Sequence, residues 1–410
     1  MSKAVTSSVP RSFKKMLVGL SVSILLFVAV VPFNAQQNQQ RPRRVTDSQD
    51  QTSTTPKAPS SAIEEVDEGD VVRVETQLVS VSAVVTNNSG RPLTGLRREN
   101  FVLFEDGKPQ TIANFETTEA PFEIALLLDT SGSTRADVAL IRQAANAFIN
   151  SLRSGDRVAI VAFNTAREGS SAIARVEVLS RLTEDRKSLQ RAIEGIGSSN
   201  GTPFYDALQR IVSDVFREPP AEELSGRRAI VALTDGVDST SASDFGSARA
   251  RLSAAGVATY FIQVNTEEFV ENRILRDCEE DGRLSLSPKQ VERYRQIFVP
   301  GSKPDHFVDF CQMGSFERMQ ISRDLYNLAR REMDALAKES GGRNFNAASL
   351  HDARRAFAQV ANEIGTQYSL GYYPSNRARD GKFRTIRVEV RGTPGTPQVR
   401  AREGYHAPRG

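Results

Sequence analysis

The middle of the chain, residues 122–374, alternates short apolar runs with longer stretches in which apolar residues recur at helical spacing. The short runs, which predict strands, are residues 124–128, 157–163, 173–179, 229–233, 259–264 and 368–373. The stretches that predict helices are residues 138–152, 189–196, 204–216, 243–255, 333–340 and 350–364. Alternation of this kind predicts an α/β fold with a mostly parallel, doubly wound sheet and helices on both faces.

Patterns typical of β-strands flank this region on both sides. Apolar and polar residues alternate within residues 71–121, where Glu105-Asp106-Gly107-Lys108 separates two strand-like runs and predicts a hairpin. Residues 375–410 contain two more strand-like runs, which pair either with the last strand of the α/β region or with the N-terminal strands. We therefore predict a small N-terminal β-domain and a C-terminal β segment around the α/β domain.

Residues 266–320 interrupt the alternation with a long polar stretch that contains several glycines and prolines. The pattern predicts one short helix within it, around residues 290–298, so we interpret the stretch as an insertion in the α/β domain. Both cysteines of the chain, Cys278 and Cys311, lie in this insertion. Export permits a disulfide between them, and two free thiols are the alternative.

The first 35 residues have the pattern of an export signal, because the basic residues Arg11, Lys14 and Lys15 stand just before an apolar run at residues 16–31. The run is short for a membrane-spanning helix, which needs about 20 residues. A bulky Phe33 stands where signal cleavage after Ala35 favours a small residue, so an uncleaved N-terminal anchor is the alternative. Both interpretations place the protein outside the cytoplasm, as a periplasmic, secreted or envelope-anchored chain. Residues 36–70 are rich in Gln, Ser, Thr and Pro, which predicts a disordered linker.

Composition narrows the function. The 410 residues include 53 basic and 50 acidic side chains, for a net charge of +3, and no basic block is interleaved with aromatic residues. Nucleic acid is therefore not an expected partner. The three histidines have neither zinc-site nor triad spacing, and the string Gly197-Ser198-Ser199-Asn200-Gly201 follows a predicted helix rather than a strand. The sequence predicts that the protein is not an enzyme.

Candidate chemistry lies in three loops. The first predicted strand is followed by Asp129-Thr130-Ser131-Gly132-Ser133, the fourth is followed by Asp235, and Thr202 lies in a loop between them. Both carboxylates stand at the carboxyl ends of predicted parallel strands, where ligand sites of open α/β sheets form. Carboxylate and hydroxyl oxygens are hard ligands of the kind that Mg²⁺ prefers. For the first loop the alternative is an ordinary helix cap, which leaves Thr202 and Asp235 without explanation.

This order of motifs resembles the von Willebrand factor type A domain with a metal ion-dependent adhesion site (MIDAS). The resemblance implies that Ser131 and Ser133 bind the metal directly, and that Thr202 does so in one state of the site. It further implies that Asp129 and Asp235 act mostly through water, and that a ligand's carboxylate takes the last position. The order of β-domain, metal-site domain and closing β segment also resembles the bacterial, acidobacterial-type family related to von Willebrand type A proteins.

From the resemblance and the pattern we predict an exported binding module. A divalent cation, Mg²⁺ or in its place Mn²⁺ or Ca²⁺, is expected to bridge the top of the sheet to a carboxylate of a protein partner. One alternative is a structural or assembly protein of the cell envelope whose metal site is mainly structural, and a less favoured one is a metal-dependent hydrolase. A membrane is expected as a partner only through an uncleaved N-terminal anchor. The oligomeric state is left open.

Overall fold

The computed structural model of the chain describes residues 78–117, 120–134, 137–168, 171–218, 227–280, 286–303 and 313–409. The predicted signal or anchor (1–35) and linker (36–70) lie outside this part, as do Cys311 and the side chain of Cys278. Within the described residues, no helix combines the length and the apolar character needed to cross a membrane.

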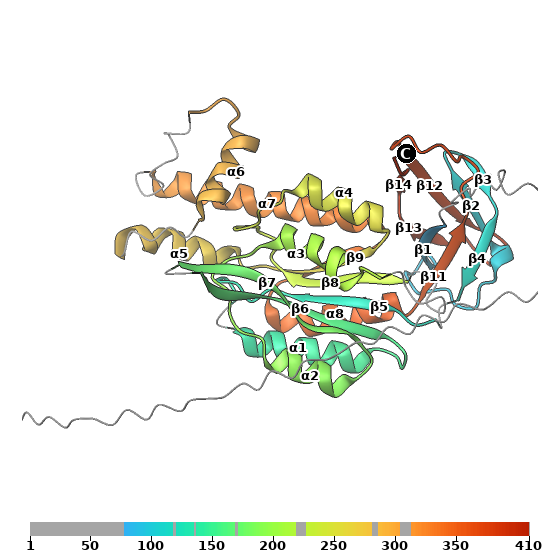
Figure 1. Cartoon of the computed structure of the whole chain (residues 1–410), viewed down its shortest axis with the longest axis horizontal. Coiled ribbons are helices and arrows are strands. Elements are labelled where there is room, and N and C mark those ends of the chain that lie inside the picture. Colours follow the sequence, from blue (N-terminus) through green and yellow to red (C-terminus); the bar gives the residue numbers. More distant parts are fainter. Residues whose placement is uncertain are drawn as a thin grey trace, which may run out of the picture. The chain divides into compact units, whose positions relative to one another are not determined.

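The α/β domain is built on a six-stranded sheet in the order β10-β9-β8-β5-β6-β7 (Figure 1). Its strands are β5 (Glu123–Leu128), β6 (Arg157–Glu168), β7 (Ser171–Thr183), β8 (Arg228–Thr234), β9 (Ala258–Val264) and β10 (Arg343–Ala347). All neighbours are parallel except β6 and β7, which form an antiparallel hairpin at one edge. Every residue of β5 and of β9 is buried, which explains why these strands are continuous apolar runs.

Helices cover both faces of this sheet, as the sequence pattern predicts. One face packs against α1 (Val138–Ser151), α2 (Arg186–Glu194) and α8 (Leu350–Ile364). The other packs against α3 (Phe204–Arg210, extended by a π-helical turn at Ile211–Val215), α4 (Phe245–Ala255) and the C-terminal half of α7 (Ser315–Ser340). Alternate residues of β5 enter the two cores, Leu126 on the first face and Leu127 on the second.

A second domain is a β-sandwich made from both ends of the described chain. One antiparallel sheet has the order β13-β1-β11-β4 and the other β14-β12-β2-β3. The N-terminal strands are β1 (Val79–Thr86), β2 (Phe101–Glu105), β3 (Lys108–Gln110) and β4 (Ile112–Glu116), with a short 3₁₀ helix at Arg98–Asn100. The C-terminal strands are β11 (Gln367–Tyr372), β12 (Phe383–Val390), β13 (Gln398–Ala401) and β14 (Gly404–His406).

The sandwich corrects two sequence predictions. Strand β11 pairs with β1 and β4, so it belongs to the sandwich. The α/β domain therefore ends before β11, and the end predicted at residue 374 is too late. All six residues of β11 are buried, so its pattern resembles that of a central parallel strand. Strand β2 forms its hairpin with β3, while β4 crosses to the other sheet.

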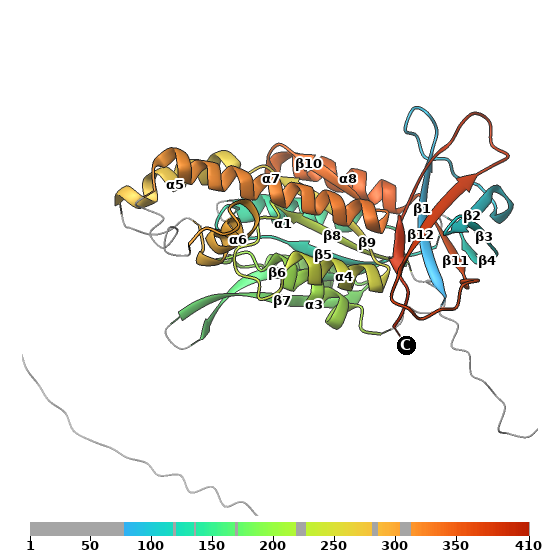
Figure 2. The ribbon, with the colours of Figure 1, turned by 90° about the horizontal axis from the view of Figure 1, so that it is seen from above.

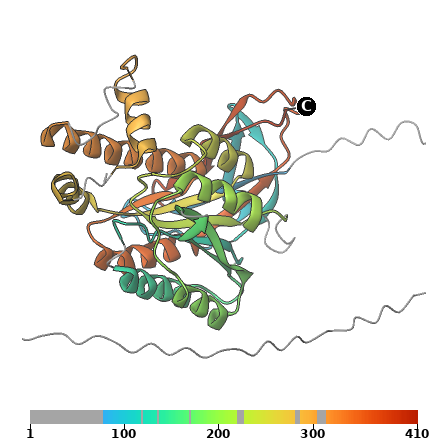
Figure 3. The same cartoon turned by 60° about the vertical axis from the view of Figure 1, so that its left-hand side comes forward.

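The predicted insertion is more helical than its composition suggests. It contains α5 (Glu267–Glu280) and α6 (Pro288–Phe298), and α7 begins at Ser315 and runs for 26 residues. Figures 2 and 3 show α5 and α6 beside the N-terminal half of α7. These three helices share a small apolar core, whose members are Ile274, Leu286, Val291, Met313, Ile321 and Leu325. We call α5, α6 and the N-terminal half of α7 the insertion helices.

Candidate metal centre

The candidate site lies where two neighbouring central strands end. Leu128 of β5 is paired with Leu233 of β8, and the backbone N–H of Asp129 donates to the carbonyl of Leu233 at 3.0 Å. Asp129 and Asp235 therefore leave the sheet almost side by side, although 106 positions separate them. Both are buried, with 1% and 3% of their surface exposed.

The first loop turns tightly around the Asp129 carboxylate. One carboxylate oxygen accepts the backbone N–H of Ser131 at 2.9 Å, and the other accepts the hydroxyl of Thr234 at 2.6 Å. The Thr134 hydroxyl donates to the carbonyls of Asp129 and Ser131, at 3.0 and 3.2 Å. These bonds hold the loop so that the hydroxyls of Ser131 and its neighbour Ser133 lie 3.5 Å apart.

The second carboxylate connects this loop to β8 and to the insertion. The Ser133 hydroxyl donates to Asp235 Oδ2 at 2.9 Å, and the backbone N–H of Val237 donates to Oδ1 at 3.0 Å. Gly236 follows with φ +76°, a backbone conformation that residues other than glycine rarely adopt. A Cβ at this position would also collide with the Met333 side chain. Glycine at position 236 thus allows the chain to turn directly after Asp235.

Thr202 reaches the site through an exchange of hydrogen bonds with the loop after β8. Its backbone N–H donates to the Ser239 hydroxyl at 2.8 Å, and its carbonyl accepts the Ser239 N–H at 3.0 Å. Asp238 accepts the N–H groups of Phe204 and Tyr205 at 2.8 and 3.3 Å, which satisfies the start of α3. Thr202 lines the same cavity as Ser131, Ser133 and Asp235.

Two residues of this arrangement were not predicted from the sequence. The Thr266 hydroxyl, at the start of the insertion, donates to Asp235 Oδ2 at 2.7 Å. The Tyr326 hydroxyl of α7 lies 3.4 Å from the same oxygen and is hydrogen-bonded to Thr266. No sequence signal identifies either residue, because both belong to the polar stretch and the helix start that the pattern left unassigned.

The oxygens that converge here fit a small divalent cation. At a metal–oxygen distance of 2.0–2.1 Å, adjacent ligands of an octahedral Mg²⁺ are about 3 Å apart. The separations of 2.9 Å from Ser133 to Asp235 and 3.5 Å from Ser133 to Ser131 bracket that value. The described residues contain no group of three or more His, Cys, Asp and Glu side chains placed to hold a metal. A cation bound here would take much of its donor set from hydroxyls, which suit Mg²⁺, Mn²⁺ or Ca²⁺ better than a soft metal.

The electrostatics of the site favour a cation. Burial and the nearby charge of Asp235 raise the pKa of Asp129 from 3.8 to about 7, although hydrogen bonds from Thr234 and Ser131 oppose the shift. A buried carboxylate of this kind is costly to ionise unless positive charge is close to it. A bound dication would supply that charge.

The raised pKa makes a prediction for the metal-free protein. Between about pH 4 and pH 7 the folded chain keeps a proton on Asp129 that the unfolded chain has lost. The free energy of unfolding is therefore highest at the acidic end of this range and falls as the pH rises. With EDTA present, this group should lower the free energy of unfolding by about 1–3 kcal/mol as the pH rises through that window. Urea unfolding at pH 5, 6, 7 and 8 measures it. With saturating Mg²⁺ the contribution of Asp129 to the pH dependence should vanish or change sign. If the free energy of unfolding changes with pH in the same way with and without Mg²⁺, Asp129 is not part of a metal site.

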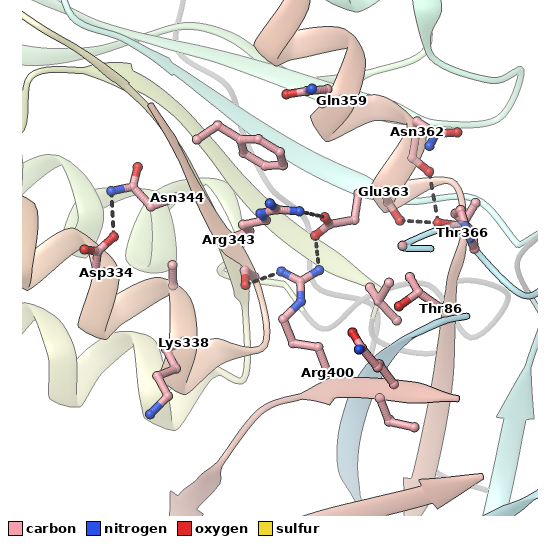
Figure 4. A pocket seen from close by; sticks show the side chains of 18 residues that line it. Thr86, Asp334, Lys338, Arg343, Asn344, Gln359, Asn362, Glu363, Thr366 and Arg400 are labelled. Carbon is pink, nitrogen blue, oxygen red and sulfur yellow. Dashed lines mark hydrogen bonds and ion pairs between the residues drawn. The ribbon is translucent and has the colours of Figure 1, made fainter. Parts of the chain in front are cut away.

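A larger cavity of about 710 Å³ lies elsewhere in the described residues, between β10 and α8 on one side and β1 and β13 on the other. Figure 4 shows Glu363 between the guanidinium groups of Arg343 and Arg400. Arg400 also donates to the carbonyl of Gly342 at 2.7 Å. The charges of Arg343, Glu363 and Arg400 pair with one another in the cavity wall. The candidate metal centre is therefore the smaller cavity, of about 260 Å³, beside Ser131, Thr202 and Asp235.

Comparison with known proteins gives one family match and several solved structures. Residues 124–237 match the family model of the von Willebrand factor type A domain, and no curated protein sequence matches significantly. Solved structures with a similar fold include proximal thread matrix protein 1 from the mussel byssus, at 14% identity, 67% of this chain, 50% of that chain and a TM-score of 0.39. Another structure of that protein, with a zinc-occupied MIDAS motif, has 13% identity over 60% of this chain and 48% of that chain, with a TM-score of 0.38. A von Willebrand factor type A structure from Catenulispora acidiphila has 11% identity over 80% of this chain and 74% of that chain, with a TM-score of 0.38. The chain spans about half the length of the mussel protein, and the acidobacterial-type relationship stays a prediction.

Proposed function

We propose that the von Willebrand factor type A domain of this chain is a binding module that holds a divalent cation and, through it, a carboxylate of a protein partner. The observation that carries the proposal is the convergence of Ser131, Ser133, Thr202 and Asp235 on one cavity, with Asp129 directly behind them. Domains of this family are in general binding modules rather than enzymes. The described residues that line the cavity include no histidine and no cysteine.

The donor set explains why an acidic group would be the ligand. Ser131, Ser133 and Thr202 offer neutral hydroxyls, and only Asp129 and Asp235 offer charge. Because few carboxylates would touch the ion, it would keep Lewis acidity for a further oxygen donor. Mg²⁺, Mn²⁺ and Ca²⁺ all suit such oxygens. Export to the periplasm, the surface or the medium is part of the proposal and rests on the sequence of residues 1–35.

The proposal is tested by capturing partners from an envelope extract with the full-length chain, in Mg²⁺ and in EDTA. A partner that requires the metal should be retained only in Mg²⁺, and the double variant Ser131→Ala, Ser133→Ala should lose it because two hydroxyl donors are gone. Ser247→Ala, an exposed change on α4, is the matched control and should bind like wild type. Equal capture by the double variant would contradict the proposal.

A second candidate function has one observation in its favour. Thr266 of the insertion and Tyr326 of α7 both contact Asp235, so a metal could serve mainly to fix the insertion helices in an envelope assembly. In that case Mg²⁺ would raise the melting temperature and protect residues 267–303 from protease, while capture of a partner would be unchanged by EDTA. These two outcomes separate the structural role from the binding role.

A further inference from the structure

The cavity of about 710 Å³ lies at an unpaired edge of the six-stranded sheet. Strand β10 is the last strand of that sheet and pairs with β9 alone. The cavity is lined by β10, by α7 from one face of the sheet and by α8 from the other, while β1 and β13 of the sandwich line its far side. Figure 2 shows β10 between α7 and α8. The cavity therefore lies where a seventh strand would continue the sheet, and we call it the edge groove.

The outer side of β10 has backbone groups available for pairing. Successive residues of a strand direct their N–H and C=O groups alternately to its two sides. The carbonyl of Ala347 accepts the N–H of Asn265 at 3.1 Å, so odd-numbered residues of β10 face β9. The carbonyl of Gly342 accepts the Arg400 side chain from the groove at 2.7 Å, which agrees with this alternation. Asn344 and Asn346 therefore point outward, and no described residue outside the sheet hydrogen-bonds to the backbone of either.

The walls of the edge groove are rich in amide side chains. These are Asn344, Gln359, Asn362 and Gln398. The last three are exposed, and their side chains make no hydrogen bond with any described residue. Each amide side chain presents both a donor and an acceptor, as does each peptide group of a polypeptide other than proline. The walls thus match a main chain in hydrogen-bonding character.

The charged side chains of the groove are balanced by one another. Glu363 pairs with Arg400 and, at 3.8 Å, with Arg343 (Figure 4). Lys338 pairs with Glu403 at 2.9 Å, and Asp334 accepts the side-chain amide of Asn344 at 2.9 Å. A strongly charged ligand would have to break one of these pairs, so an uncharged one is favoured.

Arg343 can nevertheless contact a ligand. Its 3.8 Å separation from Glu363 is longer than a hydrogen bond, and its side chain is 60% exposed. Its N–H groups can therefore donate to a carbonyl in the groove while the ion pair with Glu363 is kept.

We propose that the edge groove binds an extended, uncharged segment of a partner polypeptide, which adds to β10 as a seventh strand. The main chain of the segment pairs with the outward groups of Asn344 and Asn346, as in other cases of strand addition. Sheet edges that must stay unpaired often contain proline, and β10 has none. A single strand fits between α7 and α8, whereas a second copy of this chain would bring its own helices against these walls. No residue of the groove lines the metal cavity, so the inference does not depend on a metal.

The test starts from a displayed library of linear octapeptides, selected on the full-length chain in EDTA so that no metal contributes. Fluorescence polarisation then measures the affinity of a selected peptide for wild type, Asn346→Pro and Asn346→Ala. Asn346 is exposed, and proline there removes one outward N–H without removing a hydrogen bond to β9. The affinity of Asn346→Pro should fall about tenfold. Alanine keeps the N–H, so Asn346→Ala is the matched control and should bind like wild type.

Hydrogen exchange on wild type gives a readout that needs no variant. The peptide should slow exchange of the outward amides of Asn344 and Asn346 and leave that of Phe345, which faces β9, unchanged. N-methylation of alternate peptide residues should abolish binding in one register and spare it in the other, because only one edge of the added strand faces β10.

Three results would overturn the proposal. The first is that the library yields no binder. The second is that the selected peptides bind Asn346→Pro as tightly as wild type and leave the amides of Asn344 and Asn346 unprotected. The third is that the chain dimerises and Asn346→Pro makes it monomeric, which would identify a second copy as the occupant of the edge.

Discussion

Asp129→Asn should weaken Mg²⁺ binding by about ten- to hundredfold, as removal of a group that orients metal ligands does. The same change should raise the free energy of unfolding of the metal-free protein at pH 8 by about 1–3 kcal/mol. Burial and the charge of Asp235 raise the pKa of Asp129 to about 7, so at pH 8 its carboxylate is ionised. The ionised group is buried beside a second carboxylate, which is unfavourable without a cation. Asparagine keeps the acceptor for the N–H of Ser131 and removes the charge.

The pH dependence and the metal provide the controls for this result. Below about pH 4 both folded and unfolded chains are protonated at Asp129, so the difference in stability between wild type and variant should disappear. With saturating Mg²⁺ at pH 8 the order should reverse, because only wild type gains stability from the bound ion. Calorimetry measures the Mg²⁺ affinity. Urea unfolding measures the free energy of unfolding in EDTA at pH 8, in EDTA below pH 4, and at pH 8 with saturating Mg²⁺. A variant that is less stable than wild type in EDTA at pH 8 would show that Asp129 is mainly a structural residue.

Such a combination of lost binding and gained stability is expected where a fold holds charge for a ligand. The hydrogen bonds from Thr234 and Ser131 keep Asp129 in place but do not neutralise it. The ionised Asp129 carboxylate therefore destabilises the metal-free protein, and a cation bound beside it would remove that cost. Residues selected only for stability would not show this trade-off.

The sequence predicted the α/β domain because burial on two faces leaves a simple signature. Strands such as β5 and β9 have no exposed residue, so they appear as unbroken apolar runs between helices of amphipathic pattern. Strand β10 was missed, since Arg343, Asn344 and Asn346 interrupt its apolar character at the edge of the sheet. Strand β11 was assigned to the wrong domain, because complete burial looks the same in a sandwich as in a parallel sheet.

The candidate site was partly predictable for a related reason. Asp129 and Asp235 stand at strand ends, and the parallel pairing of β5 with β8 brings strand ends together. Contacts from the insertion were not predictable. Thr266 and Tyr326 approach the site through the packing of helices that no local pattern relates to it. The roles of all these residues toward a metal stay predictions.

Arg227→Met should lower the free energy of unfolding by about 3–5 kcal/mol, the range for an uncompensated buried polar network. Arg227 is 1% exposed and directs its guanidinium at three backbone carbonyls. It donates to Thr117 at 2.9 Å, to Ala120 at 2.6 Å and to Gln367 at 3.0 Å. The first two lie where the chain leaves the sandwich for β5, and the third lies where it returns into β11.

One side chain thus joins both connections between the two domains. The Arg227 guanidinium also lies 4.1 Å from the ring centre of Phe122, and burial lowers its pKa to about 10, so it remains charged at neutral pH. Methionine keeps most of the volume but leaves all three carbonyls without this donor. Arg387→Met, an exposed change on β12, is the matched control and should cost less than about 1 kcal/mol. Hydrogen exchange should show the amides near Thr117 and Gln367 losing protection first in Arg227→Met. If those amides stay protected and stability is unchanged, the two connections are held by the sandwich and the sheet alone.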